Sequence, residues 1–323
     1  KPIGTGPFTV ESFTPGQQST FKRNPNYWQS GLPYVDEVVI TDYADETSQV
    51  NALLGGQVDV VNLLASSVLP TVTGSGKKIL VSPGGGWTPI TMRVDASPFD
   101  DVRVRQAMRL IVDRNQMLDL VFAGNGTLGN DVFAIWDAAY DQTLPQREQD
   151  IEQAKSLLKA AGREGMTVEL VTADIAQGVV RAAQVFAEQA QAAGVTIKLR
   201  KVTVTEFYGD NYLKWVFAQD YWYYNPYLPQ VAQATHPNAP FNETHWNDPR
   251  YVKLYDEGIG TVDQARRTEI CHEMQAIDYE EGGYIIPYFP PVIDGYSPNV
   301  QGLLTSKTGI SLNSYRFLNL WLS

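Results

Sequence analysis

The sequence predicts an α/β protein built as two bodies, and three observations support this. Helix and strand patterns alternate from residue 96 to residue 285, the segments 1–86 and 284–323 are rich in strand patterns, and a capped helix begins close to residue 97. Alternating strands and helices of these lengths are typical of sheets with crossover helices. We therefore expect one body to be interrupted by the other.

The stretch 97–122 is predicted to be one helix. Ser97, Asp100 or Asp101 can cap its N-terminus, and the aspartates suit the positive end of the helix dipole. Apolar residues then recur at helical spacing, at Val104, Ala107, Met108, Ile111, Leu118 and Val121. Arginines 103, 105, 109 and 114 fall mostly off this stripe, and we expect the first three on a solvated helix face.

The first 86 residues read as α+β. Alternating residues predict strands at 8–13 and 19–23, joined by a turn at Pro15-Gly16. A helix is predicted from Asp45 or Thr47 to Leu54, where Gly55-Gly56 ends it. Further strands are expected at 35–43, 58–62 and 79–81.

The remaining elements follow in order. Helices are predicted at 151–161, 177–193, 205–215, 249–258 and 263–281, and strands at 166–172, 195–202 and from 216 through Trp222. The chain then returns to strands at 284–289, 293–296 and 315–322.

Composition excludes several classes of function. The chain has 323 residues, 43% of them hydrophobic, a formal net charge of −11 and a sequence pI of about 4.8. A nucleic-acid-binding protein needs a basic face, and no cluster of Lys and Arg provides one, so we expect no nucleic-acid partner. The sequence contains no run of about 18 apolar residues, so it predicts no membrane-spanning helix. Cys271 is the single cysteine, so an internal disulfide is excluded, and we expect this residue to be buried in a helix.

Three ordered motifs carry a family resemblance. They are Phe99-Asp-Asp-Val-Arg-Val-Arg-Gln-Ala107 with Asp113-Arg114, then the set Gly4–Phe8, Arg23–Trp28 and Ala52–Asp59, and last Glu280–Tyr288. Together they resemble the ABC-importer extracellular solute-binding proteins of family 5, the oligopeptide-, dipeptide- and nickel-binding type. The resemblance covers essentially the whole chain.

The resemblance implies a two-lobe architecture like that of type II periplasmic binding proteins, with mixed sheets and flanking helices. Lobe one would comprise 1–90 and 288–323, and lobe two 91–287. The chain would cross twice between them, forming a hinge around a venus-flytrap cleft. We also expect the chain to be a C-terminal fragment, with the N-terminal part of the family and some of lobe one absent.

The implied function is capture of a small solute, most simply a peptide, for an ABC permease in the membrane. The resemblance further implies a monomer that is exported and is either periplasmic or a cell-surface lipoprotein. No covalent step and no cofactor is implied.

The densest aromatic stretch is Asp220–Tyr227, which predicts a cleft wall that stacks on a solute. Its candidate ligand-binding residues are Trp222, Tyr223, Tyr224, Asn225 and Tyr227. Peptide-binding relatives carry a Trp here, followed three residues later by an Asp that pairs with the α-amino group of the ligand. Asn225 stands at that Asp position and has no charge, which leaves room for a blocked peptide, a sugar or another solute.

Two further stretches supply candidates. Gly84-Gly-Gly-Trp87 is a flexible crossing or a cleft edge, with Trp87, Thr88 and Thr91 as ligand-binding candidates. His245 and Trp246 end a polar loop that is typical of binding sites. The chain has three histidines without dense ligand spacing, so we expect no protein-built metal site.

Enzyme motifs are absent from the sequence. There is no Gly-x-Ser-x-Gly elbow and no His-Glu-x-x-His motif, so we expect no enzyme. Two alternatives stay open. One is a hydrolase of glycosidase type that uses a carboxylate pair in the cleft, because such a pair has no local signature. The other is a scaffold of the same fold that has lost transport.

Overall fold

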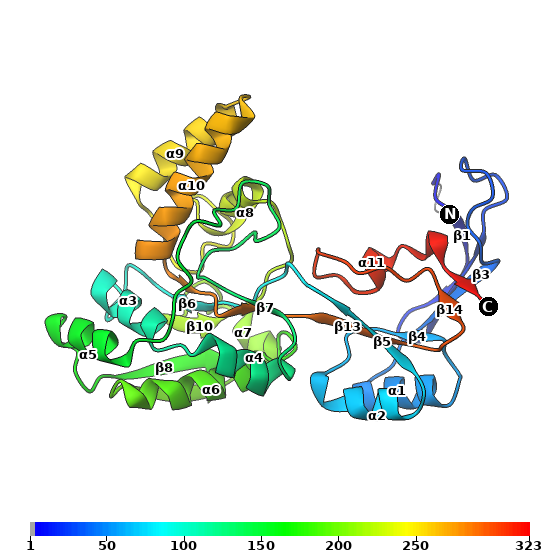
Figure 1. The fold of residues 1–323 in the computed structure, drawn as a ribbon, viewed down its shortest axis with the longest axis horizontal. Coiled ribbons are helices and arrows are strands. Elements are labelled where there is room, and N and C mark those ends of the chain that lie inside the picture. Colours follow the sequence, from blue (N-terminus) through cyan, green and yellow to red (C-terminus); the bar gives the residue numbers. More distant parts are fainter. Residues whose placement is uncertain (1–3) are drawn as a thin grey trace. The chain divides into compact units, whose positions relative to one another are not determined.

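The chain divides into two compact units in a computed structural model that describes residues 4–323. Unit 1 comprises Lys1–Pro83 and Val292–Ser323, and unit 2 is the continuous segment Gly84–Pro291. Each unit is built around its own sheets (Figure 1). The lobe boundaries expected from the sequence, near residues 90 and 288, stay a prediction.

Unit 2 is centred on a five-stranded mixed sheet with the order β11-β6-β10-β8-β9. Its strands are β6 (Ile90–Met92), β8 (Thr167–Thr172), β9 (Thr196–Lys201), β10 (Phe217–Gln219) and β11 (Tyr284–Ile285). A separate pair, β7 (Thr127–Leu128) and β12 (Tyr288–Phe289), lies beside α4.

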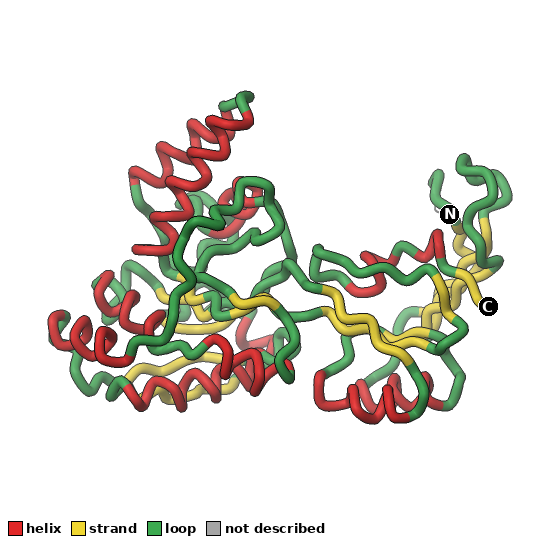
Figure 2. The backbone as a smooth tube through the Cα atoms, in the orientation of Figure 1, coloured by secondary structure: helices red, strands yellow, loops and turns green. Residues whose placement is uncertain are grey.

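The helices of unit 2 alternate with these strands, as the sequence predicts. They are α3 (Val102–Leu110), α4 (Arg114–Phe122), α5 (Ile151–Ala160), α6 (Val179–Ala192), α7 (Val204–Phe207), α8 (Tyr227–Ala234), α9 (Pro249–Gly260) and α10 (Gln264–Glu281). Figure 2 shows that the segment between β7 and α5 is a long loop. Cys271 is buried in α10, which confirms that prediction.

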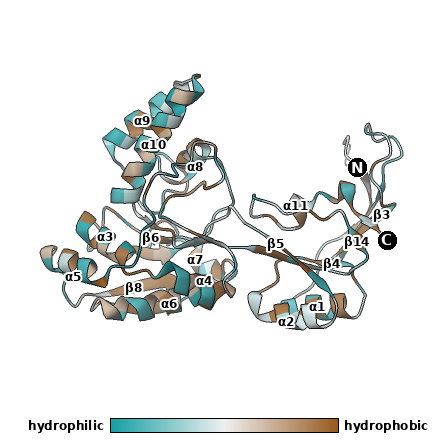
Figure 3. Ribbon diagram, in the orientation of Figure 1, coloured by the Kyte–Doolittle hydropathy of each residue, from teal (hydrophilic) through white to brown (hydrophobic). Residues whose placement is uncertain are grey.

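The main core of unit 2 lies between β8 and helices α3 to α6. Leu170 of β8 and Phe186 of α6 are fully buried there, and Phe186 packs edge-on against Phe217 of β10 with ring centroids 6.3 Å apart. The ribbon of β8 carries the hydrophobic colour in Figure 3. Side-chain packing on this strand therefore supplies much of the driving force for folding.

The predicted helix 97–122 is two helices, which corrects the expectation. Asp101 caps α3 by accepting a hydrogen bond from the backbone N–H of Arg103, as one of the predicted caps. The helix then ends at Leu110, and Asp113 caps α4 through the N–H of Gln116 at 2.9 Å. The Asp113 side chain competes with the helical backbone for this donor and so begins a second helix.

The expected solvated arginine face is confirmed for Arg103, which is exposed, and is wrong for Arg105 and Arg109, which are buried. Arg105 donates to the carbonyl of Glu281 at 2.6 and 2.9 Å, and Arg109 donates to the carbonyl of Tyr279 at 3.2 Å and to that of Gly282. The last carbonyls of a helix have no intrahelical donor. These two arginines cap α10, which has no basic residue in its own last turn.

Arg114 belongs to a buried ionic cluster. Its Nη2 lies 2.7 Å from Asp131 Oδ2, and Arg147 Nε lies 2.8 Å from the same oxygen. Asp131 Oδ1 accepts from the backbone N–H of Ile286 at 2.9 Å. Burial opposes ionisation of Asp131, but the charges of Arg114, Arg147 and Arg109 outweigh it and lower the pKa of Asp131.

Unit 1 has a small core and a second, open sheet. The core lies between the sheet β4-β13-β5 and helices α1 and α2, with Leu53, Leu64, Val72 and Ile293 fully buried or nearly so. The elements are β4 (Val60–Val61), β5 (Lys78–Ser82), β13 (Val292–Tyr296), α1 (Glu46–Leu54), a 3-10 turn at Ser66–Val68 and α2 (Leu69–Gly74).

The open sheet is the antiparallel meander β1 (Phe8–Thr14), β2 (Gln18–Arg23) and β3 (Glu37–Thr41). The register pairs Val10 with Phe21 and Phe21 with Val38, so one face is mostly apolar. Its apolar side chains are partly or fully exposed and share the face with Ser19 and Arg23; they are Phe8, Val10, Phe13, Phe21, Val38 and Ile40.

The C-terminal segment differs from its prediction. The expected strand 315–322 is replaced by the short helix α11 (Ser311–Tyr315), a 3-10 turn at Phe317–Asn319 and the two-residue strand β15 (Trp321–Leu322), which pairs with β14 (Val300–Gln301). The expected helix 205–215 is also only one turn, α7, followed by turns. Its Tyr- and Trp-rich sequence packs on the sheet instead of continuing the helix.

Candidate functional site

An aromatic stack in unit 2 forms the centre of the candidate site. The backbones of Trp87 and Trp222 form an isolated antiparallel bridge, with N–H to carbonyl distances of 2.9 and 2.8 Å. Their rings stack with centroids 5.7 Å apart and planes 11° apart. On its other side Trp87 stacks on Phe133 at 5.2 Å, and Tyr284 meets it edge-on. The position of Trp222 is therefore fixed by both backbone and ring contacts.

The stack continues in two directions. Phe133 stacks on Tyr227 at 5.1 Å, within the second core of the unit. Phe241 packs edge-on against Trp222 at 6.0 Å. Phe241 lies in the loop before Trp246, so this loop helps to hold Trp222.

The segment 221–225 lies between the buried aromatic stack and solvent. Trp222, Tyr224 and Asn225 are half-buried, and the side chain of Tyr223 is 57% exposed. Tyr221 meets Tyr223 edge-on at 5.7 Å. Asn225 Nδ2 donates to Gln230 Oε1 at 3.1 Å. The structure thus presents an aromatic surface with one amide on a rigid support, which suits stacking and neutral hydrogen bonding.

Five of the predicted ligand-binding residues are buried within unit 2. They are Trp87, Thr88, Thr91, Tyr227 and Trp246. A residue must be exposed to contact a solute directly. The role of these five residues as solute contacts therefore stays a prediction. Each has a packing or hydrogen-bonding task, such as the bond from the Thr91 hydroxyl to the carbonyl of Ala218 at 3.3 Å.

Tyr227 belongs to a buried polar network around Asp278. Asp278 Oδ2 accepts from the hydroxyl of Tyr227 at 2.5 Å and from that of Tyr251 at 3.2 Å. Burial raises the pKa of Asp278 to about 7, although the two tyrosines act against the rise. The network ties α8, α9 and α10 together.

His245 is held by two hydrogen bonds and has an exposed fraction of 34% in its side chain. Its Nδ1 lies 2.9 Å from Asp95 Oδ2, and its Nε2 lies 2.8 Å from the carbonyl oxygen of Leu213. Both ring nitrogens are therefore engaged within unit 2. A solute contact by His245 stays a prediction and would use the ring face or edge.

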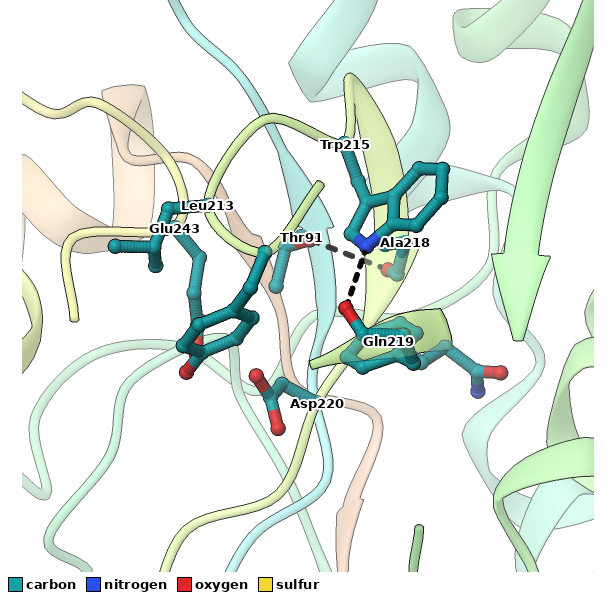
Figure 4. A pocket seen from close by; sticks show the side chains of 9 residues that line it. Thr91, Leu213, Trp215, Ala218, Gln219, Asp220 and Glu243 are labelled. Carbon is teal, nitrogen blue, oxygen red and sulfur yellow. Dashed lines mark hydrogen bonds between the residues drawn. The ribbon is translucent and has the colours of Figure 1, made fainter. Parts of the chain in front are cut away.

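A buried pair of carboxyl groups lies close to Trp222, whose side chain interacts with one of them, Glu243. Asp220 and Glu243 are 3% and 5% exposed and line the same small cavity, of about 10 Å³, with Thr91 and Tyr212 (Figure 4). The hydroxyl of Tyr208 donates to Asp220 Oδ1 at 2.7 Å, and that of Tyr284 donates to Glu243 Oε2 at 3.0 Å. Burial raises the pKa of Glu243 well above its usual range, and the neighbouring charge of Asp220 raises it further.

Sequence reasoning did not find this pair. Asp220 and Glu243 lie 23 positions apart and have no shared motif. An acidic residue among Tyr and Trp residues was the only available signal, and it does not identify a partner.

A second, larger pocket of about 480 Å³ lies elsewhere in unit 2 and contains none of the predicted site residues. Residues of β8 and β10 and of the turn after β6 line it. They include Thr167 and Glu169 of β8, Phe217 of β10 with Lys214 before it, and Ser97 of the turn.

Two searches of the described residues gave negative results. Within 4–323, no group of three or more His, Cys, Asp or Glu side chains is placed to hold a metal ion. None of the helices in the same range combines the length and the apolar character that crossing a bilayer requires.

Comparison with known proteins gives the family. Residues 1–241 match the family model described as "Bacterial extracellular solute-binding proteins, family 5 Middle". A relative named Di/tripeptide-binding protein 3, from Pseudomonas aeruginosa, is 27% identical over 293 residues, covering 87% of this chain and 55% of the relative. Heme-binding protein A from Haemophilus influenzae is 25% identical, covering 96% and 58%. The chain thus spans little more than half the length of these relatives.

Solved structures match the fold. The substrate-binding protein CtaP of Listeria monocytogenes has a TM-score of 0.88 at 18% identity, covering 99% of this chain and 67% of that one. The periplasmic binding protein DppA of Helicobacter pylori, solved with the peptide STSA, has a TM-score of 0.83 at 19% identity, covering 100% and 64%. These matches confirm the predicted fold class of type II periplasmic binding proteins.

The family is one of binding proteins, not enzymes, and the predicted resemblance is confirmed over the matched residues. With the model matching 1–241 of 323 residues and the fold matching nearly all of them, this chain belongs to the family 5 bacterial extracellular solute-binding proteins.

Proposed function

We propose that this chain is part of the solute-binding component of an ABC importer, and that residues 221–225 contact the solute. The observation that carries the proposal is the partly exposed aromatic segment, which is fixed from behind by the Trp87–Trp222 stack. A rigid aromatic surface can bind a planar peptide group or a sugar face with little loss of side-chain entropy.

The proposed activity is reversible capture followed by delivery to a membrane permease. It needs no covalent step. An exported location, in the periplasm or at the cell surface, follows from the family name, whereas a lipid anchor and a monomeric state rest on the family resemblance alone.

The proposed solute is peptide-like, without a requirement for a free α-amino group. Relatives are named for di- and tripeptides, glutathione and heme, so family membership supports several solute classes. Asn225 supplies a neutral amide that is already paired with Gln230, and a neutral amide binds an ammonium group less strongly than a carboxylate does. We therefore expect N-acetylated peptides to bind at least as well as free ones.

The hydrolase alternative is not supported by the acid pair. A glycosidase needs space for a sugar ring between its two carboxyl groups, which lie roughly 5–10 Å apart. Asp220 and Glu243 border a cavity of only about 10 Å³, which is close to the space that one water needs.

The proposal is tested by calorimetric titration with free and N-acetylated di- and tripeptides and with oligosaccharides, followed by mass spectrometry of the solute. Binding with full recovery of unchanged solute supports capture. A cleaved product would identify a hydrolase, and no binding to any member of the panel would favour the scaffold alternative.

A pair of variants locates the surface. Tyr223→Ala removes an exposed ring of the proposed surface, and Tyr34→Ala removes a ring of matched exposure, 55%, in unit 1. We expect the first change to weaken peptide binding by about 2- to 10-fold, the value of one aromatic contact, and the second to leave it unchanged. Equal effects would remove residues 221–225 from the contact surface.

A further inference from the structure

The pair formed by Asp220 and Glu243 has no task in the fold or in the proposed solute contacts. The two side chains line the same small cavity (Figure 4), and each carboxyl group affects the pKa of the other. The second oxygen of each, Asp220 Oδ2 and Glu243 Oε1, has no N–H or O–H donor in good geometry among residues 4–323. Two buried carboxylates in this position would repel each other strongly.

The described groups that interact with the pair most strongly are neutral donors. They are the hydroxyls of Tyr208, Tyr212 and Tyr284, the indole N–H of Trp222, which faces Glu243, and the backbone N–H of Tyr221, which donates to Asp220. On the neighbouring segments, the guanidinium of Arg93 is paired with Asp95, and the ring of His245 also contacts Asp95. The cavity is also too small for a hydrated metal ion, since its volume is that of about one water.

A proton is the remaining way to reconcile the two carboxyl groups. When Glu243 is protonated, its hydroxyl can donate to Asp220, and an O–H···O⁻ bond between such groups is short and strong. Asp220 keeps its charge in that state, because it already accepts from the Tyr208 hydroxyl and from the backbone N–H of Tyr221 at 2.8 Å.

The pair joins the two segments that surround Trp222. Asp220 directly follows β10 and precedes residues 221–225. Glu243 lies in the loop whose Phe241 packs on the ring of Trp222. This loop is also fixed to β6 and the segment after it, where the backbone N–H of Val94 donates to the carbonyl of Thr244 at 2.9 Å.

We propose that Asp220 and Glu243 are positioning residues that share one proton, and that this proton holds the Phe241 loop against Trp222. Loss of the proton pushes the loop away, loosens the Trp87–Trp222 stack and weakens solute binding at residues 221–225. The last step rests on the proposed function, whereas the coupling of the proton to the stack does not.

The test reads the stack without any solute. Two stacked indole rings exchange excitation energy and give a paired circular-dichroism band, which Trp222→Phe should abolish and thereby assign. In the unaltered protein we expect this band to fall reversibly, by more than half, as the pH is raised in steps from about 5 to about 9, because burial and the neighbouring charge of Asp220 raise the pKa of Glu243.

Glu243→Gln is the decisive variant. Its amide can donate to Asp220 and accept from Tyr284 at every pH, so the band should become independent of pH. Glu169→Gln, which removes an exposed carboxyl group on β8, is the control and should keep the pH dependence of the unaltered protein. If Glu243→Gln does not fold, Asp220→Asn provides the same neutralisation from the other side.

The outcomes separate the two claims. A band that is constant with pH in the unaltered protein, or a pH dependence that survives in Glu243→Gln and Asp220→Asn, overturns the shared proton. Peptide binding is then titrated at the low and the high pH. In proteins whose band is lost at the higher pH, the peptide affinity should fall about 10-fold or more there, as expected when one charge-assisted bond is broken. In proteins that keep the band, the affinity should not change. A pH-dependent band without peptide binding at either pH retains the proton linkage and rejects the proposed solute.

Discussion

Two sheets in this chain share an apolar character but differ in how they are covered. In unit 2, β8 buries Leu170 completely beneath α6, whose Phe186 is also fully buried. In unit 1, the meander β1–β2–β3 carries a face of similar composition, yet Phe13 on that face is 68% exposed and Val10 is 47% exposed. An alternating apolar pattern therefore predicts a strand in both places but does not predict what covers it.

The difference matters for stability, because apolar area stabilises a fold only when it leaves water. The unit 2 sheet places Trp87, Trp222 and the acid pair on a framework that is packed within its own unit. The unit 1 meander gains little from its apolar face within the described residues. The four predictions below test this contrast, beginning with the largest expected effect.

Truncation of a core ring should separate the two sheets most clearly. Phe186→Ala should lower the free energy of unfolding by about 3–5 kcal/mol, because a large buried ring leaves a cavity. Phe13→Ala, the matched change on the open face, should alter it by less than about 0.5 kcal/mol. Urea unfolding followed by Trp fluorescence and by far-ultraviolet circular dichroism measures both. Similar losses in the two variants would mean that the open face is covered.

Charge pairs should show the same contrast. Asp131→Asn leaves Arg114 and Arg147 buried without an anion and should cost about 3–5 kcal/mol. Glu37→Gln removes one partner of Lys22 in the exposed meander, and we expect little change because water screens such an ion pair. The same unfolding assay applies, and a loss below about 1 kcal/mol in Asp131→Asn would contradict the buried cluster.

Asp278 should contribute to the pH dependence of the free energy of unfolding of unit 2. Burial raises its pKa to about 7 in the folded chain, whereas an unfolded aspartate titrates near about pH 4. The folded form therefore binds more protons than the unfolded form between these pH values. The stability that Asp278 contributes is greatest below about pH 4 and falls as the pH rises toward 7. The contribution of this one group falls by at most about 1.4 kcal/mol per pH unit.

Asp278→Asn keeps an acceptor for Tyr227 and Tyr251 and cannot ionise, so it should remove that slope. Unfolding measured in urea at several pH values gives the result. An unchanged slope in the variant would assign the pH dependence to other groups.

A smaller effect concerns the solute surface. Asn225→Asp introduces a carboxylate where peptide-binding relatives carry one, and a charge-assisted bond is about twice as strong as a neutral one. Affinity for free-amine peptides should rise about 10-fold by calorimetry, with no gain for N-acetylated peptides. An equal gain for both peptide types would show that position 225 does not face the amino terminus of the solute.

Local signals in the sequence predicted much of the fold. The cap at Asp101 is one of those that the sequence predicts, because its side chain competes for a backbone donor. The same rule accounts for an error, because Asp113 lies inside the predicted helix 97–122 but caps a new helix in the structure. A helical stripe of apolar residues continues across a short break, so periodicity alone does not reveal the break.

Contacts between distant residues were not predictable. Arg105 and Arg109 donate to carbonyls that lie 176 and 173 residues later, at the end of α10, and no local pattern distinguishes such arginines from solvated ones. Asp220 and Glu243 meet for the same kind of reason, through the pairing of β10 with β6 and the loop before α9. At the candidate site, composition identified the aromatic segment 220–227 but could not separate half-exposed Trp222 from fully buried Tyr227.

Hydrogen exchange measured with and without an N-acetylated tripeptide tests the central claim most directly. The account predicts slower exchange at residues 221–225 on addition of the peptide, unchanged exchange in the Phe186 core, and recovery of intact peptide. Exchange that is unaffected at 221–225 while the peptide binds, or recovery of a cleaved peptide, would contradict it.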